Sequence, residues 1–186
     1  MRRVCLVVAA AVLVAGAAAC SEDPDPQVAP PDPPTPTVTT TPASGPVAPT
    51  LPPEAEGDDA AAAEAFVRFY WEMVNFAQRT GDVAPLDELG SEACTACAGG
   101  AAGIRETYER GGTIEGGRAT VLSARGTEIS SSLGRAFVVM ARVETSRQRV
   151  VVPGAEDIRR RGGVVRFQFV VQRRDGRWAV ARWDAL

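Results

Sequence analysis

The sequence contains no histidine and no lysine, and these two absences remove several kinds of chemistry at once. Histidine is the commonest general base near neutral pH, so histidine-dependent catalytic triads and mixed Cys/His metal sites are excluded. Without lysine, the chain has neither the familiar phosphate-binding loop nor a Schiff-base nucleophile. All 20 basic residues are arginine. The composition therefore favours a protein that binds rather than one that catalyses.

The first 20 residues have the layout of a secretory signal peptide. Two arginines are followed by 16 uncharged residues, 4–19, which is shorter than the roughly 20 residues of a membrane-spanning helix. Three alanines then lead into Cys20. We expect residues 1–19 to be a signal peptide, cleaved between Ala19 and Cys20. There are two alternatives: an ordinary signal peptide that happens to end near a cysteine, and an uncleaved membrane anchor.

The cleavage region resembles the lipobox of bacterial lipoproteins, in which the cysteine after the cut carries a diacylglycerol. Ala18-Ala19-Cys20 match this motif, whereas Ala17 stands where leucine is usual. The resemblance implies a lipid anchor on Cys20 and a location at the extracytoplasmic face of the cell membrane. The exclusive use of arginine, with abundant alanine, glycine and proline, is typical of an actinobacterial coding sequence.

Residues 20–59 are expected to form a disordered tether. Twelve of the 14 prolines lie between Pro24 and Pro53, and residues 21–59 contain eight acids and no base. Such a segment cannot bury enough apolar surface to offset the entropy of ordering it. Proline-rich chain is extended and semi-rigid, so the tether would lift a domain away from the membrane.

Residues 60–186 have the length of a single domain with its own core. Residues 118–186 contain 14 arginines and only six acids. A basic patch could bind an anionic polymer, but arginine also decorates the exposed faces of strands in a chain without lysine. No nucleic-acid motif accompanies the charge, so nucleic acid is not an expected partner.

Helical periodicity marks residues 60–80, where apolar side chains recur every three or four positions. Asp59 suits the N-cap of this helix and Gly81 its C-terminal cap. A short helix is expected at residues 85–89 because proline favours the first helical position. A third helix is expected at residues 91–110, capped by its first residue, a serine.

From residue 118 onward apolar and polar residues alternate, which predicts strands. The dipeptide Asp175-Gly176 predicts a tight hairpin before the last of them. Helices followed by antiparallel strands predict an α+β domain, with N-terminal helices packed on a curved antiparallel sheet. The expected strands cover residues 118–129, 135–152, 164–173 and 178–183.

This order of elements resembles the cone-shaped, cystatin-like fold of nuclear transport factor two and its relatives. An ordered set of motifs within residues 60–186 also resembles a family of actinobacterial lipoproteins of uncharacterised function. The resemblance implies architecture and location but no mechanism. The motifs are Phe69-Tyr70-Trp71, Val74-Asn75-Phe76, Thr80-Gly81-Asp82, Cys94 with Cys97, Gly111-Gly112 and Glu115-Gly116-Gly117.

Cys94 and Cys97 admit three interpretations: a disulfide, a redox pair or half of a metal site. A zinc site needs two further ligands, and the domain has no other cysteine and no histidine, so we expect no metal. Thiols outside the cytoplasm oxidise, which favours a structural disulfide at the start of the third helix. Thiol–disulfide exchange is the alternative.

Cone-shaped folds often contain a pocket between the helices and the concave sheet. Tyr70, Trp71, Asn75 and Tyr108 would line it here, although aromatics at helical spacing also fill ordinary cores. We expect a non-enzymatic domain that binds a small apolar ligand, a cell-envelope component or a protein, without a cofactor. Acid–base catalysis in the pocket is the alternative, but no pair of carboxylates can be placed for it. Glu115, between glycine pairs, is expected in a turn.

Overall fold

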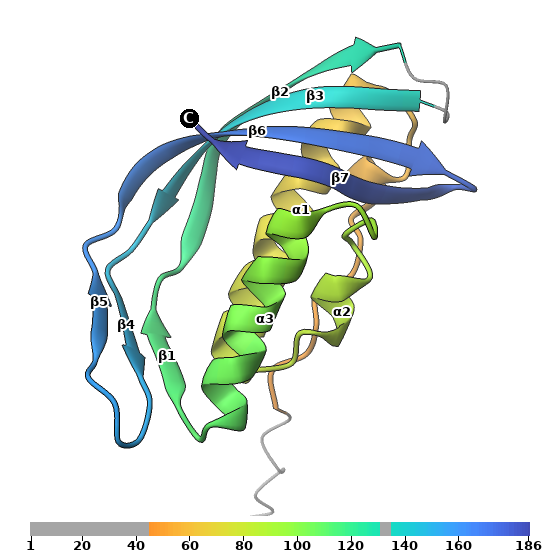
Figure 1. Cartoon of the computed structure of the whole chain (residues 1–186). Helices are drawn as coiled ribbons and strands as arrows, with labels where there is room; N and C mark the ends of the chain where they lie inside the picture. Colours follow the sequence, from red (N-terminus) through yellow and green to blue (C-terminus); the bar gives the residue numbers. More distant parts are fainter. Residues whose placement is uncertain (1–44, 131–134) are drawn as a thin grey trace, which may run out of the picture. The chain divides into compact units, whose positions relative to one another are not determined.

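The computed structural model describes residues 45–130 and 135–186 (Figure 1). The expected signal peptide, the lipidation site Cys20 and most of the tether lie outside the described residues. No helix in the described part has the length and apolar character needed to cross a membrane. In chain order the elements are η1 (Pro53–Ala55), α1 (Ala60–Thr80), α2 (Ala84–Asp87), α3 (Thr95–Glu109), β1 (Thr113–Gly116), β2 (Ala119–Ile129), β3 (Arg135–Thr145), β4 (Gln148–Val151), β5 (Ile158–Arg160), β6 (Gly163–Arg174) and β7 (Arg177–Ala185).

Helix α1 begins and ends where the sequence predicts. The carboxylate of Asp59 accepts a hydrogen bond from the Ala62 amide at 2.8 Å, which caps the first turn. Gly81 ends the helix in the left-handed conformation, with φ 79°. Helix α3 starts later than expected, because Cys94 rather than Ser91 occupies its N-cap position.

The strands form two antiparallel sheets, which confirms the α+β class. The larger sheet has the order β2-β3-β6-β7 and the smaller one the order β1-β4-β5. The predicted hairpin joins β6 to β7, and both of its turn residues, Asp175 and Gly176, have positive φ.

Three connections carry the chain directly from one sheet into the other, at residues 117–118, 146–147 and 161–162. Hydrogen bonds continue across the bend, since the amide of Gly117 donates to the carbonyl of Arg147 at 2.9 Å. The strand predicted over residues 135–152 is therefore two strands, β3 and β4, separated at this bend. Strands β1 and β5 were not predicted. Glu115 lies in β1, opposite Arg149, and not in a turn.

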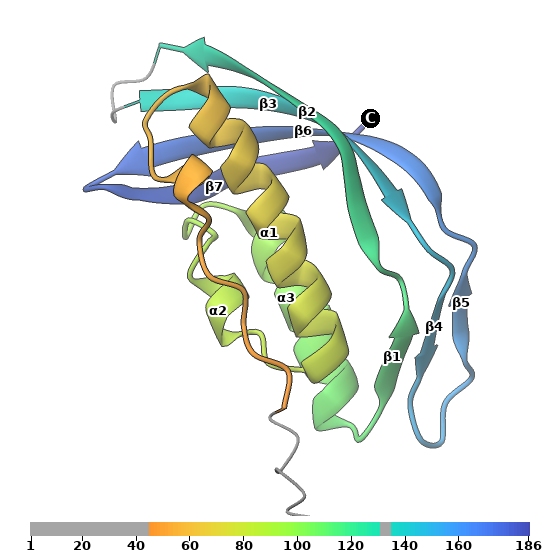
Figure 2. The same ribbon diagram turned by 180° about the vertical axis from the view of Figure 1, so that it is seen from behind.

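The core lies between α1 and the larger sheet. The apolar stripe of α1 is buried, as are the inward faces of β3 and β6. Within it, the ring of Trp71 packs 5.0 Å from that of Phe167, and Tyr70 meets Phe169 edge to face at 5.7 Å. Helices α1 and α3 run side by side below this sheet, and the smaller sheet faces them (Figures 1 and 2).

Residues 45–59 pack on the domain, which corrects the expected tether boundary at residue 59. Figure 2 shows this segment running along α1 and α2 before it enters α1. Ala55 in η1 is completely buried, and its carbonyl accepts a hydrogen bond from the Trp178 indole at 2.8 Å. The Arg173 guanidinium donates to the carbonyl of Gly57 in the same segment. Composition alone could not reveal these contacts, because the partners lie more than 100 residues away.

Both edges of the larger sheet receive hydrogen bonds from other parts of the chain. At β2 the donors and acceptors are side chains of α1: Glu64 accepts from the Gly126 amide, and Arg68 donates to the Val121 carbonyl. At β7 they are backbone groups, since the Val180 amide donates to Leu89 at 2.8 Å and the Val180 carbonyl accepts from Ser91 at 2.9 Å.

Candidate functional site

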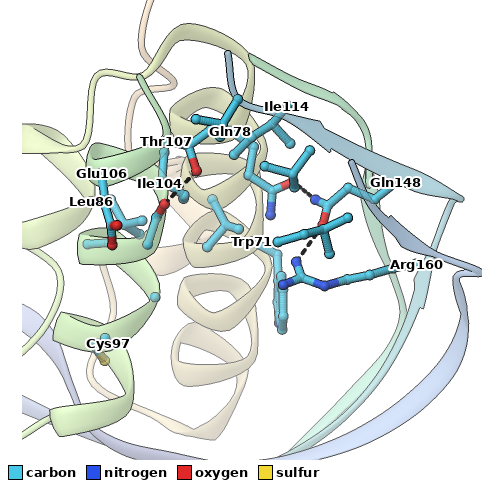
Figure 3. Close-up of a pocket in the computed structure, with 18 of the residues that line it drawn as sticks. Trp71, Gln78, Leu86, Cys97, Ile104, Glu106, Thr107, Ile114, Gln148 and Arg160 are labelled. Atoms are coloured by element: carbon cyan, nitrogen blue, oxygen red, sulfur yellow. Dashed lines mark hydrogen bonds between the residues drawn. The ribbon is translucent and has the colours of Figure 1, made fainter. Parts of the chain in front are cut away.

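A cavity of about 490 Å³ lies between α1, α3 and the smaller sheet (Figure 3). This volume is within the range of ordinary small-molecule sites. The bend between the two sheets creates the space, because it turns β1, β4 and β5 away from the core and toward the helices. Apolar residues from these elements and from α2 line it: Trp71, Val74, Leu86, Ile104, Ile114, Val150 and Ile158.

A chain of three polar side chains crosses one side of the cavity. The Arg160 guanidinium donates to Gln148 Oε1 at 2.6 Å, and Gln148 Nε2 donates to Gln78 Oε1 at 3.0 Å. The three residues come from β5, β4 and α1, and Figure 3 shows them side by side. Space for Gln148 depends on Gly117, where a Cβ atom would come within 2.2 Å of Gln148 Nε2.

Two of the four predicted pocket residues, Tyr70 and Trp71, line this cavity. Both are also part of the aromatic core, so these residues line the pocket and fill the core at the same time. Burial raises the pKa of the Tyr70 hydroxyl to about 12, and the neighbouring Trp183 indole offsets this only in part. Tyr70 is therefore a neutral phenol at physiological pH.

Asn75 lies outside the cavity and has a structural role. Its Nδ2 donates to the Ala119 carbonyl at 2.8 Å, and its Oδ1 accepts from the Ala119 amide at 2.7 Å. These two bonds fasten the start of β2 to α1 directly after the bend at Gly116-Gly117. Asn75 thus helps to position the wall of the cavity rather than lining it.

Tyr108 also lies outside the cavity. Its hydroxyl donates to the main-chain carbonyl of Gln78 at 2.7 Å, close to the C-terminal end of α1. Its ring fits against Gly81 so closely that a Cβ atom there would come within 2.6 Å of it. Tyr108 therefore joins α3 to the end of α1.

The cavity has one carboxylate in its lining, Glu106. The Glu106 side chain is 71% exposed and lies 3.6 Å from Arg110, one turn along the same helix. Figure 3 shows it on the side of the cavity opposite Arg160. Within the described residues no group of three or more potential metal ligands gathers, here or elsewhere.

Cys94 and Cys97 lie at disulfide distance, with 2.04 Å between their sulfur atoms. Both residues are buried, at 1% and 8% exposure. Cys94 Sγ also accepts a hydrogen bond from the Cys97 amide and so caps α3. The side of α3 that borders the cavity follows directly, with Cys97, Gly100, Gly103 and Thr107 in its lining.

One protein-family model covers most of the chain. A model of the family of unknown function DUF6318 matches residues 35–184. The chain belongs to that family. No curated protein matches the sequence.

Among solved structures, the crystal structure of the intermembrane space region of the chloroplast protein ARC6 is similar to this family member. The TM-score is 0.51 at 16% sequence identity, over 69% of this chain and 96% of that one. At this identity the similarity concerns the fold alone.

Gln78, Gln148 and Arg160 were not predicted from the sequence. Each belongs to a different element, and no motif links them. Only the pairing of Gln148 with Arg160 across β4 and β5 brings two of them together, and β5 itself was not predicted. The alternation of side chains along β4 is the one sequence signal that could have placed Gln148 on the cavity side, because Gln148 and Val150 share a face of the strand.

Proposed function

We propose that this protein is a lipid-anchored lipoprotein of the extracytoplasmic membrane face whose domain binds a small ligand without transforming it. The lipobox-like Ala18-Ala19-Cys20 and the proline-rich segment after it support the location. The order of helices and the bent strands support a cone-shaped fold like that of nuclear transport factor two. The motif set supports an actinobacterial lipoprotein origin.

The observation that carries the binding proposal is the cavity itself. It has the volume of a small-molecule site, a largely apolar lining and a hydrogen-bonded group of polar side chains at one side, with Glu106 at the opposite side. Ligand sites usually combine these three properties. Ile158, an apolar residue with 54% exposure, projects into this lining and would lose contact with water when a ligand binds.

The two alternatives have less support. Acid–base catalysis needs a carboxylate held inside the cavity with a perturbed pKa, and Glu106 is largely in water at its rim. Thiol exchange needs an accessible sulfur, whereas Cys94 and Cys97 are buried. Neither reaction is therefore the function that the geometry supports best.

A cavity-filling variant tests the binding proposal. Gly103 lines the cavity, and a Cβ atom at this position would meet nothing within 4 Å, so Gly103→Phe adds a ring to the lining without a clash at its first atom. Ala102→Phe adds the same ring to an exposed position of α3 outside the lining and is the matched control. The probe is N-phenyl-1-naphthylamine, an uncharged apolar fluorophore. Saturable binding that Gly103→Phe abolishes and Ala102→Phe preserves is the expected result. Equal binding by both variants would refute a site in this cavity.

The anchor has its own test. Cys20→Ala removes the thiol that would carry the lipid, and we expect the full chain to move from the membrane fraction to the soluble fraction. Labelling with an alkyne-bearing fatty acid should mark the parent protein and not the variant. A Cys20→Ala protein that stays as firmly in the membrane as the parent would contradict the lipid anchor.

A further inference from the structure

The pairing of β1, β4 and β5 places two cross-strand rows on the cavity side of the smaller sheet. Ile114 lies opposite Val150, which lies opposite Ile158, and this row is apolar. The next row runs from Gly116 to Gln148 to Arg160, and it is polar. Because side chains two residues apart in a strand share a face, both rows face the cavity, and all but Gly116 line it.

The hydrogen bonds of the polar row have a fixed direction. Arginine can only donate, so Gln148 must turn its oxygen to Arg160 and its amide nitrogen to Gln78. Gln78 then accepts through its oxygen, which leaves its own NH₂ group as a donor. Within the described residues this NH₂ group and the remaining N–H groups of Arg160 have no acceptor. In Figure 3 the Gln78 amide nitrogen points away from Gln148.

The charges of the smaller sheet are separated between its two faces. On the face away from the cavity, Arg149 lies 2.7 Å from Asp157 and 3.4 Å from Glu115, and Arg159 lies 3.6 Å from Asp157. Arg160 points to the opposite face and has no carboxylate within 4 Å in the part of the chain that the structure describes. The outer arginines Arg149 and Arg159 are thus paired with carboxylates, as is Arg110 with Glu106 in the cavity lining, whereas Arg160 is not.

We infer that the ligand of this cavity is amphipathic, with an acidic oxygen group, a carboxylate or a phosphate, bound by Arg160 and the Gln78 amide. Its apolar body lies against the row of Ile114, Val150 and Ile158 and against Trp71. The inference rests on the proposed ligand-binding function and adds the chemical class of the ligand. An ionised acceptor satisfies donors that the protein leaves unpaired, and charge-assisted hydrogen bonds of this kind are the strong ones.

The test uses the full chain and four probes: dodecanoate, dodecyl phosphate, 1-dodecanol and inorganic phosphate. Binding is followed by tryptophan fluorescence, since Trp71 and Trp183 both line the cavity. Because Arg160 is exposed and water screens part of its charge, we expect the two acids to bind about fivefold more tightly than the alcohol. The ratio between dodecanoate and dodecyl phosphate then distinguishes a carboxylate from a phosphate head group.

Two arginine variants separate this inference from a general effect of charge. Arg160→Gln should reduce the affinity for the acids to that for the alcohol and leave the alcohol unchanged. Arg159→Gln removes a charge from the neighbouring residue on the opposite face and should change neither. Equal loss of acid binding in both variants would overturn the inference, because long-range charge would then explain the preference.

The remaining outcomes distinguish a failure of this inference from a failure of the proposed ligand-binding function. If acid and alcohol bind equally to the parent and to Arg160→Gln, the acidic head group is refuted and ligand binding stands. Binding of inorganic phosphate as tight as that of dodecyl phosphate would refute the amphipathic ligand. If no dodecyl probe binds and N-phenyl-1-naphthylamine also fails to bind, the proposed function itself is refuted.

Discussion

The indole nitrogen of Trp178 donates a hydrogen bond to the carbonyl oxygen of Ala55, 2.8 Å away, across a sequence separation of 123 residues. Trp178 also stacks on Phe66 of α1, with 5.8 Å between ring centroids. Ala55, in the segment before α1, is therefore part of the hydrophobic core. Removal of the segment would leave a buried donor without an acceptor and would expose aromatic surface to water.

Two fragments test the importance of this segment. We expect residues 45–186 to be more stable than residues 60–186 by about 2 kcal/mol or more, from one lost hydrogen bond and newly exposed apolar surface. Urea unfolding of both fragments measures the difference. Trp178→Phe should destabilise the longer fragment by about 1 kcal/mol and the shorter one much less, because the acceptor is absent there. Fragments of equal stability would contradict the role of Ala55.

Asn75 should contribute more to the free energy of unfolding than its partly exposed position indicates. Asn75→Ala leaves both the amide and the carbonyl of Ala119 without their partner, and we expect a loss of about 2–4 kcal/mol in the free energy of unfolding. Arg68→Ala, which removes one bond to the Val121 carbonyl of the same strand, is the control and should cost about 1 kcal/mol. Urea denaturation checks both values. A smaller loss for Asn75→Ala than for Arg68→Ala would show that other contacts hold β2 against α1.

Tyr70 should make the domain sensitive to alkaline pH. Burial raises its pKa from 10.0 to about 12, so the unfolded chain ionises first and the folded state keeps the neutral phenol. The stabilisation is complete below pH 10 and is lost as the pH rises toward 12. A pKa difference of about two corresponds to about 3 kcal/mol. Unfolding curves between pH 9 and 12 measure this loss.

Tyr70→Phe provides the control for the alkaline transition, since phenylalanine has no ionisable group. The variant should retain its stability over the same pH range, apart from effects common to both proteins. Tyrosinate absorbance at 295 nm reports the ionisation directly, because the chain contains only two tyrosines. If parent and variant lost stability equally between pH 10 and 12, the ionisation of Tyr70 could not be the cause.

The Cys94–Cys97 bond should stabilise the start of α3 modestly. Its loop is short, with a sequence separation of 3, and loop-closure entropy for such a loop amounts to about 2 kcal/mol. Cys94→Ala/Cys97→Ala should lower the free energy of unfolding by about this amount. Dithiothreitol should bring the parent to the same value and leave the double variant unchanged. A parent whose thiols are demonstrably free, yet whose stability is unaltered, would refute a stabilising role.

Parts of the fold follow from local signals. Residues 60–80 carry the helical period together with caps at both ends, so every local preference agrees with α1. Asp175-Gly176 fixes the last hairpin in the same way, because both residues tolerate positive φ.

Other parts depend on partners that are distant in the sequence. The bend between β3 and β4 falls at Ser146-Arg147, where the sequence has neither glycine nor proline. The glycines lie instead at the two neighbouring crossings between the sheets, Gly116-Gly117 and Gly162-Gly163, all four with positive φ. A strand bent by its neighbours has no local signature, and the polar row of the cavity depends on that bend.

The covered edges of the larger sheet have a consequence for association between molecules. An exposed edge strand can add a strand from another chain, which begins edge-to-edge aggregation. Here Glu64, Arg68 and Asn75 engage backbone groups of β2, and Leu89 and Ser91 engage those of Val180 in β7. The smaller sheet has two short edge strands, β1 with four residues and β5 with three, two of which are arginine. We therefore expect many copies to remain separate even when they are crowded on one surface.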